Sequence, residues 1–119
     1  MENFSKALRL RIYISSTDKL KHSLLFETIV YQAKRYGLAG ATVYKGIMGY
    51  GASSVIHSYK FWEITEKLPV TVEVVDLEEN IRRFYDKVKP FLEDMRYGCM
   101  VTAEPIEVWL YKEGSKRDY

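Results

Sequence analysis

The densest group of residues that could hold a ligand lies between Gly46 and Leu68. Three glycines begin this segment, and two serines, a histidine and a lysine follow among aromatic residues: Gly46, Gly49, Gly51, Ser53, Ser54, His57 and Lys60. Glycine lets a ligand or another chain approach the backbone closely, and successive loop N–H groups can bind an anion. The segment therefore predicts a loop that binds a small ligand, a sister subunit or a partner protein.

Structural explanations for the same residues stay open. The glycines would also suit a strand end that needs positive φ, and the serines could hydrogen-bond only to their own loop. No phosphate-binding P-loop is present, because the glycines are not followed by Gly-Lys-Ser or Gly-Lys-Thr. Aromatic residues inside the segment, Phe61 and Trp62, are candidates for an interface or for packing onto their own domain.

No catalytic pattern accompanies the loop. The only cysteine, Cys99, has no histidine near it in the sequence that could activate it as a thiolate. We therefore interpret Cys99 as a structural residue and not as a nucleophile. The two histidines, His22 and His57, have no metal-ligand spacing around them, and the carboxylates show no paired acid–base spacing. The sequence therefore predicts a protein that is not an enzyme and that has no metal site.

Bulk composition points to one small domain. The chain has 119 residues, 47% of them hydrophobic, with a formal net charge of +2. That length predicts a single domain over residues 1–119, with a flexible tail from about residue 112. The charge is too small to indicate nucleic-acid binding. No apolar run approaches the length of a membrane span and no signal-peptide core is present, so we expect a cytoplasmic protein that is not membrane-embedded.

Hydrophobic periodicity predicts alternating strands and helices. Leu8, Leu10 and Ile12 alternate with Arg9 and Arg11, as in a strand with one buried face. Strands are predicted at 7–14, 41–45, 70–75, 99–103 and 106–111, and helices at 19–36 and 77–95, the first starting after the N-cap candidates 15–18. Pro90 is expected to kink or split the second helix.

The order of these elements is β-α-β-β-α-β with an extra strand, which is typical of a ferredoxin-like α+β sandwich. That fold has an antiparallel sheet with two helices on one face, and here a long connection spans residues 46–68. The other sheet face would carry Arg9, Arg11, Tyr13, Tyr44, Thr71 and Glu73. An open face with large side chains needs covering, and oligomerisation is the simplest way to cover it.

The chain resembles the PII-like (GlnB-like) superfamily over nearly its whole length. The resemblance rests on the run 40–54, Gly-Ala-Thr-Val-Tyr-Lys-Gly-Ile-Met-Gly-Tyr-Gly-Ala-Ser-Ser, on His57, and on Leu68-Pro69 before the strand 70–75. It is similar in particular to an uncharacterised bacterial and archaeal branch that is often encoded near CrcB-type fluoride exporters. The glycine-rich run resembles the base of the PII T-loop, and Leu68-Pro69 resembles its exit.

This resemblance implies a trimeric signalling protein. Adenine nucleotides would bind in clefts between subunits, and the T-loop would dock on a partner such as a membrane transporter. One side of the cleft would be lined by Thr42, Gly49, Gly51, Ser53 and Ser54, and the neighbouring subunit would contribute Arg96, Gly98 and Cys99.

The chain also departs from the PII pattern. Cys99 stands where PII proteins have a lysine, and Trp109 and Tyr111 stand where they have an Arg-x-Arg element. Those cations neutralise phosphates. A less charged nucleotide, another small anion or no ligand therefore stays open, with Lys60 or Lys112 as substitute cations. The alternative is a divalent-metal-binding trimer like the CutA proteins, which share the fold.

Overall fold

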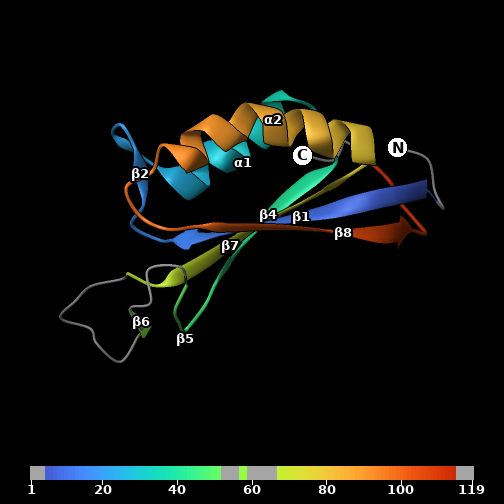
Figure 1. Cartoon of the computed structure of the whole chain (residues 1–119). Coiled ribbons are helices and arrows are strands. Elements are labelled where there is room, and N and C mark those ends of the chain that lie inside the picture. The colour runs from blue at the N-terminus through green and yellow to red at the C-terminus, as the bar shows by residue number, and fades with distance from the viewer. Residues whose placement is uncertain (1–4, 52–56, 59–66, 115–119) are drawn as a thin grey trace.

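The fold is an α+β sandwich with one sheet and one helical layer (Figure 1). The computed structural model describes residues 5–51, 57–58 and 67–114. Its antiparallel sheet has the order β4-β7-β1-β8, formed by β1 (Ser5–Ser15), β4 (Gly40–Lys45), β7 (Pro69–Asp76) and β8 (Met100–Val108). Two helices, α1 (Leu25–Arg35) and α2 (Glu78–Glu93), cover one face. This is the ferredoxin-like arrangement that the order of elements predicted.

The core lies between the sheet and the two helices, where the alternating strand residues meet the apolar helix faces. Ile12, Val72 and Val74 are fully buried at the centre of the sheet. The helices contribute Leu25, Ile29 and Ala33 from α1 and Ile81, Phe84, Val88 and Leu92 from α2. The predicted second helix is confirmed to within two residues, and Pro90 does not split it, because the helix continues to Glu93.

The first helix begins later than predicted. Residues 19–24 form a small hairpin of β2 (Lys19–Leu20) and β3 (Ser23–Leu24), so His22 lies in its turn and not on a helix. Asp18 does not cap a helix at Lys19. Its carboxylate accepts the Ser15 N–H at 2.8 Å, and its backbone oxygen accepts the Leu25 N–H at 2.8 Å. The polar side chain that favours a helix N-cap equally favours a turn, and here it stabilises the turn.

The last strand is longer than predicted. The sequence suggested two short strands separated by Pro105, but β8 runs without a break and pairs Pro105 with Leu8. Because β8 is at the edge of the sheet, the missing proline N–H can face away from β1 without loss of a ladder hydrogen bond. The prediction of a separate fifth strand at 106–111 is therefore wrong.

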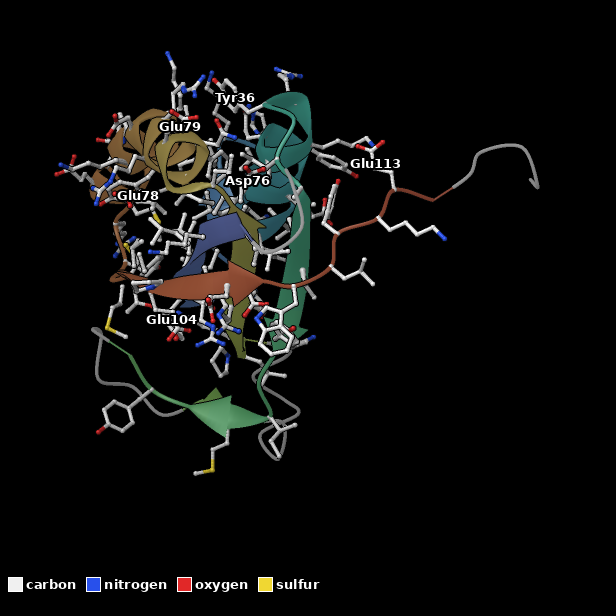
Figure 2. All side chains as sticks on the ribbon, turned by 90° about the vertical axis from the view of Figure 1, so that its right-hand side faces the viewer. Tyr36, Asp76, Glu78, Glu79, Glu104 and Glu113 are labelled. Carbon is white, nitrogen blue, oxygen red and sulfur yellow. The ribbon has the colours of Figure 1, made fainter. Side chains whose placement is uncertain are left out.

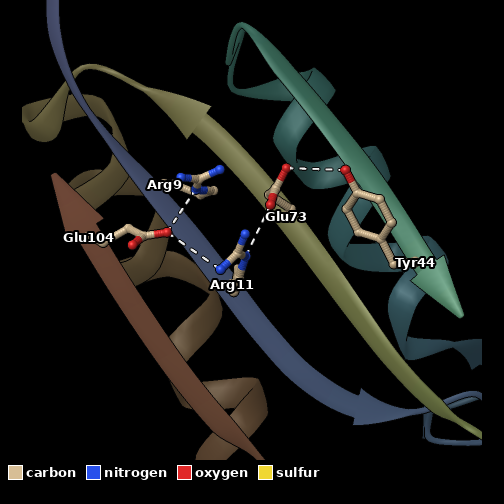
Figure 3. Close-up of polar contacts among 5 residues, drawn as sticks. All are labelled: Arg9, Arg11, Tyr44, Glu73 and Glu104. Carbon is tan, nitrogen blue, oxygen red and sulfur yellow. Dashed lines mark hydrogen bonds and ion pairs between the residues drawn. The ribbon is translucent and has the colours of Figure 1, made fainter. Parts of the chain in front are cut away.

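The open face of the sheet carries the polar residues that the alternation predicted (Figure 3). Arg11 donates to Glu73 at 3.0 Å and lies 3.4 Å from Glu104, while Arg9 lies 2.9 Å from the same Glu104 oxygen. Tyr44 approaches Glu73 at 3.5 Å. These cross-strand pairs balance their charges, and because their arginine side chains are partly open to solvent, each pair is expected to contribute little to stability.

Part of the long connection forms a second hairpin, β5 (Met48–Gly49) with β6 (His57–Ser58). Figures 1 and 2 place β5 beneath the sheet, on the side away from the helices. None of the helices in the described part of the chain is long and apolar enough to cross a membrane.

Candidate ligand site at the base of the long connection

The two ends of the connection 46–68 are held together at one end of the sheet. Gly46 donates its N–H to the Pro69 carbonyl at 2.8 Å, which extends the β4–β7 pairing by one residue. Leu68 exchanges two hydrogen bonds with Ser16 at the end of β1, one from its N–H to the Ser16 hydroxyl at 3.0 Å. The base of the connection is thus bound to both β1 and β4.

Two of the predicted glycines approach Pro69 closely, and at Gly46 the space is too small for a side chain. A Cβ atom on Gly46 would lie 2.9 Å from Cγ of Pro69, and one on Gly49 would lie 3.3 Å from the same atom. A Cβ on Gly51 would meet nothing within 4 Å. None of the three has a positive φ, so the strand-end explanation from backbone angles is wrong, and close approach to Pro69 replaces it for Gly46 and, less tightly, for Gly49.

The α2–β8 turn lies at the same end of the sheet. Met100, the first residue of β8, pairs with Tyr13 on β1. Tyr13 in turn pairs with Thr71 on β7, and Thr71 pairs with Tyr44 on β4. The predicted residues Arg96, Gly98 and Cys99 therefore lie at the level where β4 passes into the long connection. The fold brings the two predicted parts of the site to one end of the molecule.

A cation–tyrosine cluster joins these two parts, formed by Lys67, Arg96 and Tyr97. The Lys67 ammonium lies 4.6 Å from the Tyr97 ring centroid, and the Arg96 guanidinium carbon lies 5.4 Å from it. Both distances are within the range of cation–π attraction. The sequence pattern pointed to Arg96 but not to Lys67, although Lys67 directly precedes the Leu68-Pro69 junction that resembles the loop exit.

Thr42 lies apart from this cluster within one chain. It is on β4, at the opposite edge of the sheet from β8. Three strand spacings separate the two edges, about 14 Å. The expectation that Thr42 and Cys99 of neighbouring subunits line one cleft stays a prediction.

Cys99 packs against the core, and its Sγ lies 4.0 Å from the Leu92 carbonyl oxygen. Burial raises the pKa of the Cys99 thiol above its ordinary value, and the charge of Asp18 adds to the rise. A raised pKa keeps the thiol protonated near neutral pH, so Cys99 is a poor nucleophile or metal ligand.

This pKa shift predicts slow alkylation. The rate of reaction with iodoacetamide should rise with pH through a midpoint that is higher in the folded protein than in the same chain in urea, because only the thiolate reacts. Mass spectrometry of samples quenched across pH 7 to 10 would measure both curves. A lower midpoint in the folded protein would reveal an activated thiolate and contradict this assignment.

The remaining predicted residues are only partly open to structural description. Ser53, Ser54 and Lys60, with Phe61 and Trp62, lie outside the described residues, and for His57 only the backbone in β6 is described. The start of the connection exposes large apolar side chains: Ile47 is 69% exposed and Tyr50 is 72% exposed, with Met48 between them. We call Ile47, Met48 and Tyr50 the apolar arm.

Acidic side chains do not converge on the described part of the site. Figure 2 shows Glu78 and Glu79 in the helical layer and Glu104 on the opposite side of the sheet. Among the described residues, no group of three or more His, Cys, Asp or Glu side chains could hold a metal ion.

Comparison with known proteins identifies the family. Residues 7–108 match the model of DUF190, a family described as uncharacterized ACR. The chain belongs to this DUF190 family. A UPF0166 protein of Aquifex aeolicus is 34% identical over 83% of this chain and 90% of its own length. A UPF0166 protein of Methanocaldococcus jannaschii is 43% identical over 70% of this chain and 76% of its own.

Solved structures with the same fold are PII-like proteins. One is CPII, a nitrogen regulatory PII-like protein from Thiomonas intermedia bound to ADP, AMP and bicarbonate. It superposes with a TM-score of 0.67 at 17% identity and covers 89% of this chain and 91% of CPII. A putative PII-like signaling protein from Thermus thermophilus gives a TM-score of 0.62 at 18% identity, covering 90% and 93%. The PII-like fold expected for this DUF190 member is confirmed.

Proposed function

We propose that this protein is a non-enzymatic PII-like regulatory protein. It senses a small anionic ligand, adenine-nucleotide-like in character, at clefts between the subunits of a trimer. The observation that carries this proposal is the meeting of the loop base and the α2–β8 turn at one end of the sheet, with Lys67 and Arg96 beside an exposed tyrosine. CPII, which has this fold, binds ADP and AMP, and that supports the choice of ligand class.

The assembly and the partner belong to the same proposal. The open sheet face, with charge-balanced pairs between Arg9, Arg11, Glu73 and Glu104, is suited to packing against copies of itself. The apolar arm exposes the kind of side chains that anchor protein interfaces, so the segment 46–68 contacts a partner protein. The proposed partner is a membrane transporter or another protein that this cytoplasmic regulator contacts.

Thermal unfolding at fixed protein concentration tests the ligand. The panel is ATP, ADP, AMP, cyclic nucleotides, fluoride and divalent metals, with sedimentation velocity to measure the assembly. A nucleotide at 100 times its Kd should stabilise the native state by about 2.7 kcal/mol. A shift with metals alone would favour the CutA-like alternative, and no shift with any nucleotide would refute the sensing of nucleotides.

A further inference from the structure

The charged residues on the open face of the sheet are all paired within the chain. Residues directly opposite each other on neighbouring strands share a face, so the register assigns Arg9, Arg11, Glu73 and Glu104 to the side away from the helices. They are the only lysine, arginine, aspartate or glutamate residues that the described strands of the sheet place on that side. Two positive and two negative charges sum to zero.

Glu104 is the residue that joins both arginines. Its Oε1 atom lies 2.9 Å from Nε of Arg9 and 3.4 Å from Nη1 of Arg11. On the other side, Nε of Arg11 lies 3.0 Å from Oε1 of Glu73. Figure 3 shows these four side chains as one row across β8, β1 and β7. We call this row of Arg9, Arg11, Glu73 and Glu104 the charge row.

The outer surface of the helices is organised differently. It exposes charged side chains of both signs, including those of Lys34, Arg35, Glu79, Asp86 and Lys87. Within the described part of the chain, the only ion pair on the helices joins Arg82 to Glu78. Complete pairing is therefore a property of the open sheet face, and partly exposed pairs stabilise a single chain too little to explain it.

Complete pairing matters for a surface that meets copies of itself. Around the axis of a symmetric assembly the same residues of each copy come together, so an unpaired arginine would lie near the same arginine of the next copy. Such like-charge contacts are strongly unfavourable, and an unpaired buried charge also loses its hydration. A partner of different sequence would be matched by opposite charge. The neutral charge row offers no net charge to match, so it suits a second copy of this chain.

We propose that the charge row neutralises the open sheet face for contact with a second copy of this chain, and that Glu104 is the residue on which this neutrality depends. Without Glu104, the face of every subunit would carry one uncompensated arginine. The inference rests on the proposed function for the existence of an assembly. It adds the residue that decides whether copies of the face can meet.

Sedimentation velocity over a range of protein concentrations, at low and at high salt, tests the role of Glu104. Glu104→Gln should raise the dissociation constant of the assembly by about 10-fold or more at low salt, and high salt should reverse part of the loss by screening the repulsion. Combining Arg9→Gln with Glu104→Gln restores neutrality and should restore assembly. The matched control is Glu78→Gln, which breaks the Arg82 pair on the helices and should leave assembly unchanged. Circular dichroism checks that each variant is folded.

The outcomes separate this inference from the proposed function. If Glu104→Gln assembles as tightly as the wild type, the inference is refuted while the proposed trimer stands. If the wild type forms a dimer that Glu104→Gln dissociates, the role of Glu104 stands and the trimer falls. If the double variant with Arg9→Gln fails to assemble, charge is not the cause and the inference is overturned. A wild type that stays monomeric at every concentration refutes the inference and the assembly together, whereas the proposed ligand is measured separately by thermal unfolding.

Discussion

Replacing Asp76 with alanine should destabilise the protein by about 3 kcal/mol, because it strips a buried acceptor from three donors. The Asp76 side chain accepts the Ala39 N–H at 2.8 Å, the Leu77 N–H at 2.6 Å and the Asn80 side-chain amide at 2.8 Å. Asp76 is only 5% exposed, so water does not readily replace the lost oxygen atoms. The carboxylate ties the start of β4 to the start of α2, across 37 positions of sequence.

Urea denaturation at fixed protein concentration would measure this change as a lower midpoint with an unchanged slope. Asp76→Asn is the matched variant, since it keeps the shape and one acceptor oxygen, and it should lose roughly half as much. Glu79→Ala, an exposed acid in the first turn of the same helix, should change stability by less than about 0.5 kcal/mol. An Asp76→Ala protein as stable as the Glu79→Ala control would show that these hydrogen bonds contribute little.

Replacing Gly46 with alanine should destabilise the base of the connection by about 1 to 3 kcal/mol. The new Cβ would lie 2.9 Å from Pro69 Cγ, and a proline ring cannot rotate away as a flexible side chain would. Moving the backbone instead would stretch the 2.8 Å hydrogen bond from the Gly46 N–H to the Pro69 carbonyl. The steric conflict and the hydrogen bond therefore oppose each other.

A double-mutant cycle isolates this contact. Pro69→Ala removes Cγ, so the pair Gly46→Ala with Pro69→Ala should be more stable than the sum of the single changes predicts, by 0.5 kcal/mol or more. Gly51→Ala, where a Cβ meets nothing within 4 Å, is the matched glycine control and should be nearly neutral. Additive effects in the cycle would mean that Gly46 is required for another reason.

Much of the fold follows from short-range sequence patterns. The alternation of Leu10, Ile12 and Ile14 with arginines predicted β1 and its polar open face, and the confirmed register pairs Arg11 with Glu73 across that face. The apolar stripe of α2 predicted its extent. Such features are readable because the periodicities of strands and helices are properties of neighbouring residues.

Short-range sequence patterns gave wrong element boundaries where the same residue types occur in two different conformations. The polar cluster before Lys19 suits a helix N-cap and a turn equally, and only the bond from the Leu25 N–H to the Asp18 carbonyl shows that the helix begins six residues later. Pro105 suggested a break, because the sequence does not show which strand lies at an edge. Edge position depends on the strand order of the whole sheet.

The sequence by itself determined the class of the fold and the long glycine-led connection, and it named Gly46, Gly49 and Arg96 as candidate site residues. Only the tertiary structure decided that Gly46 and Gly49 lie against Pro69, with no room for a side chain at Gly46, and that Lys67 and Arg96 both lie near the Tyr97 ring. The physical reason is that strand pairing brings distant segments to the same end of the sheet. Contacts between residues far apart in the chain leave no periodic trace in the sequence.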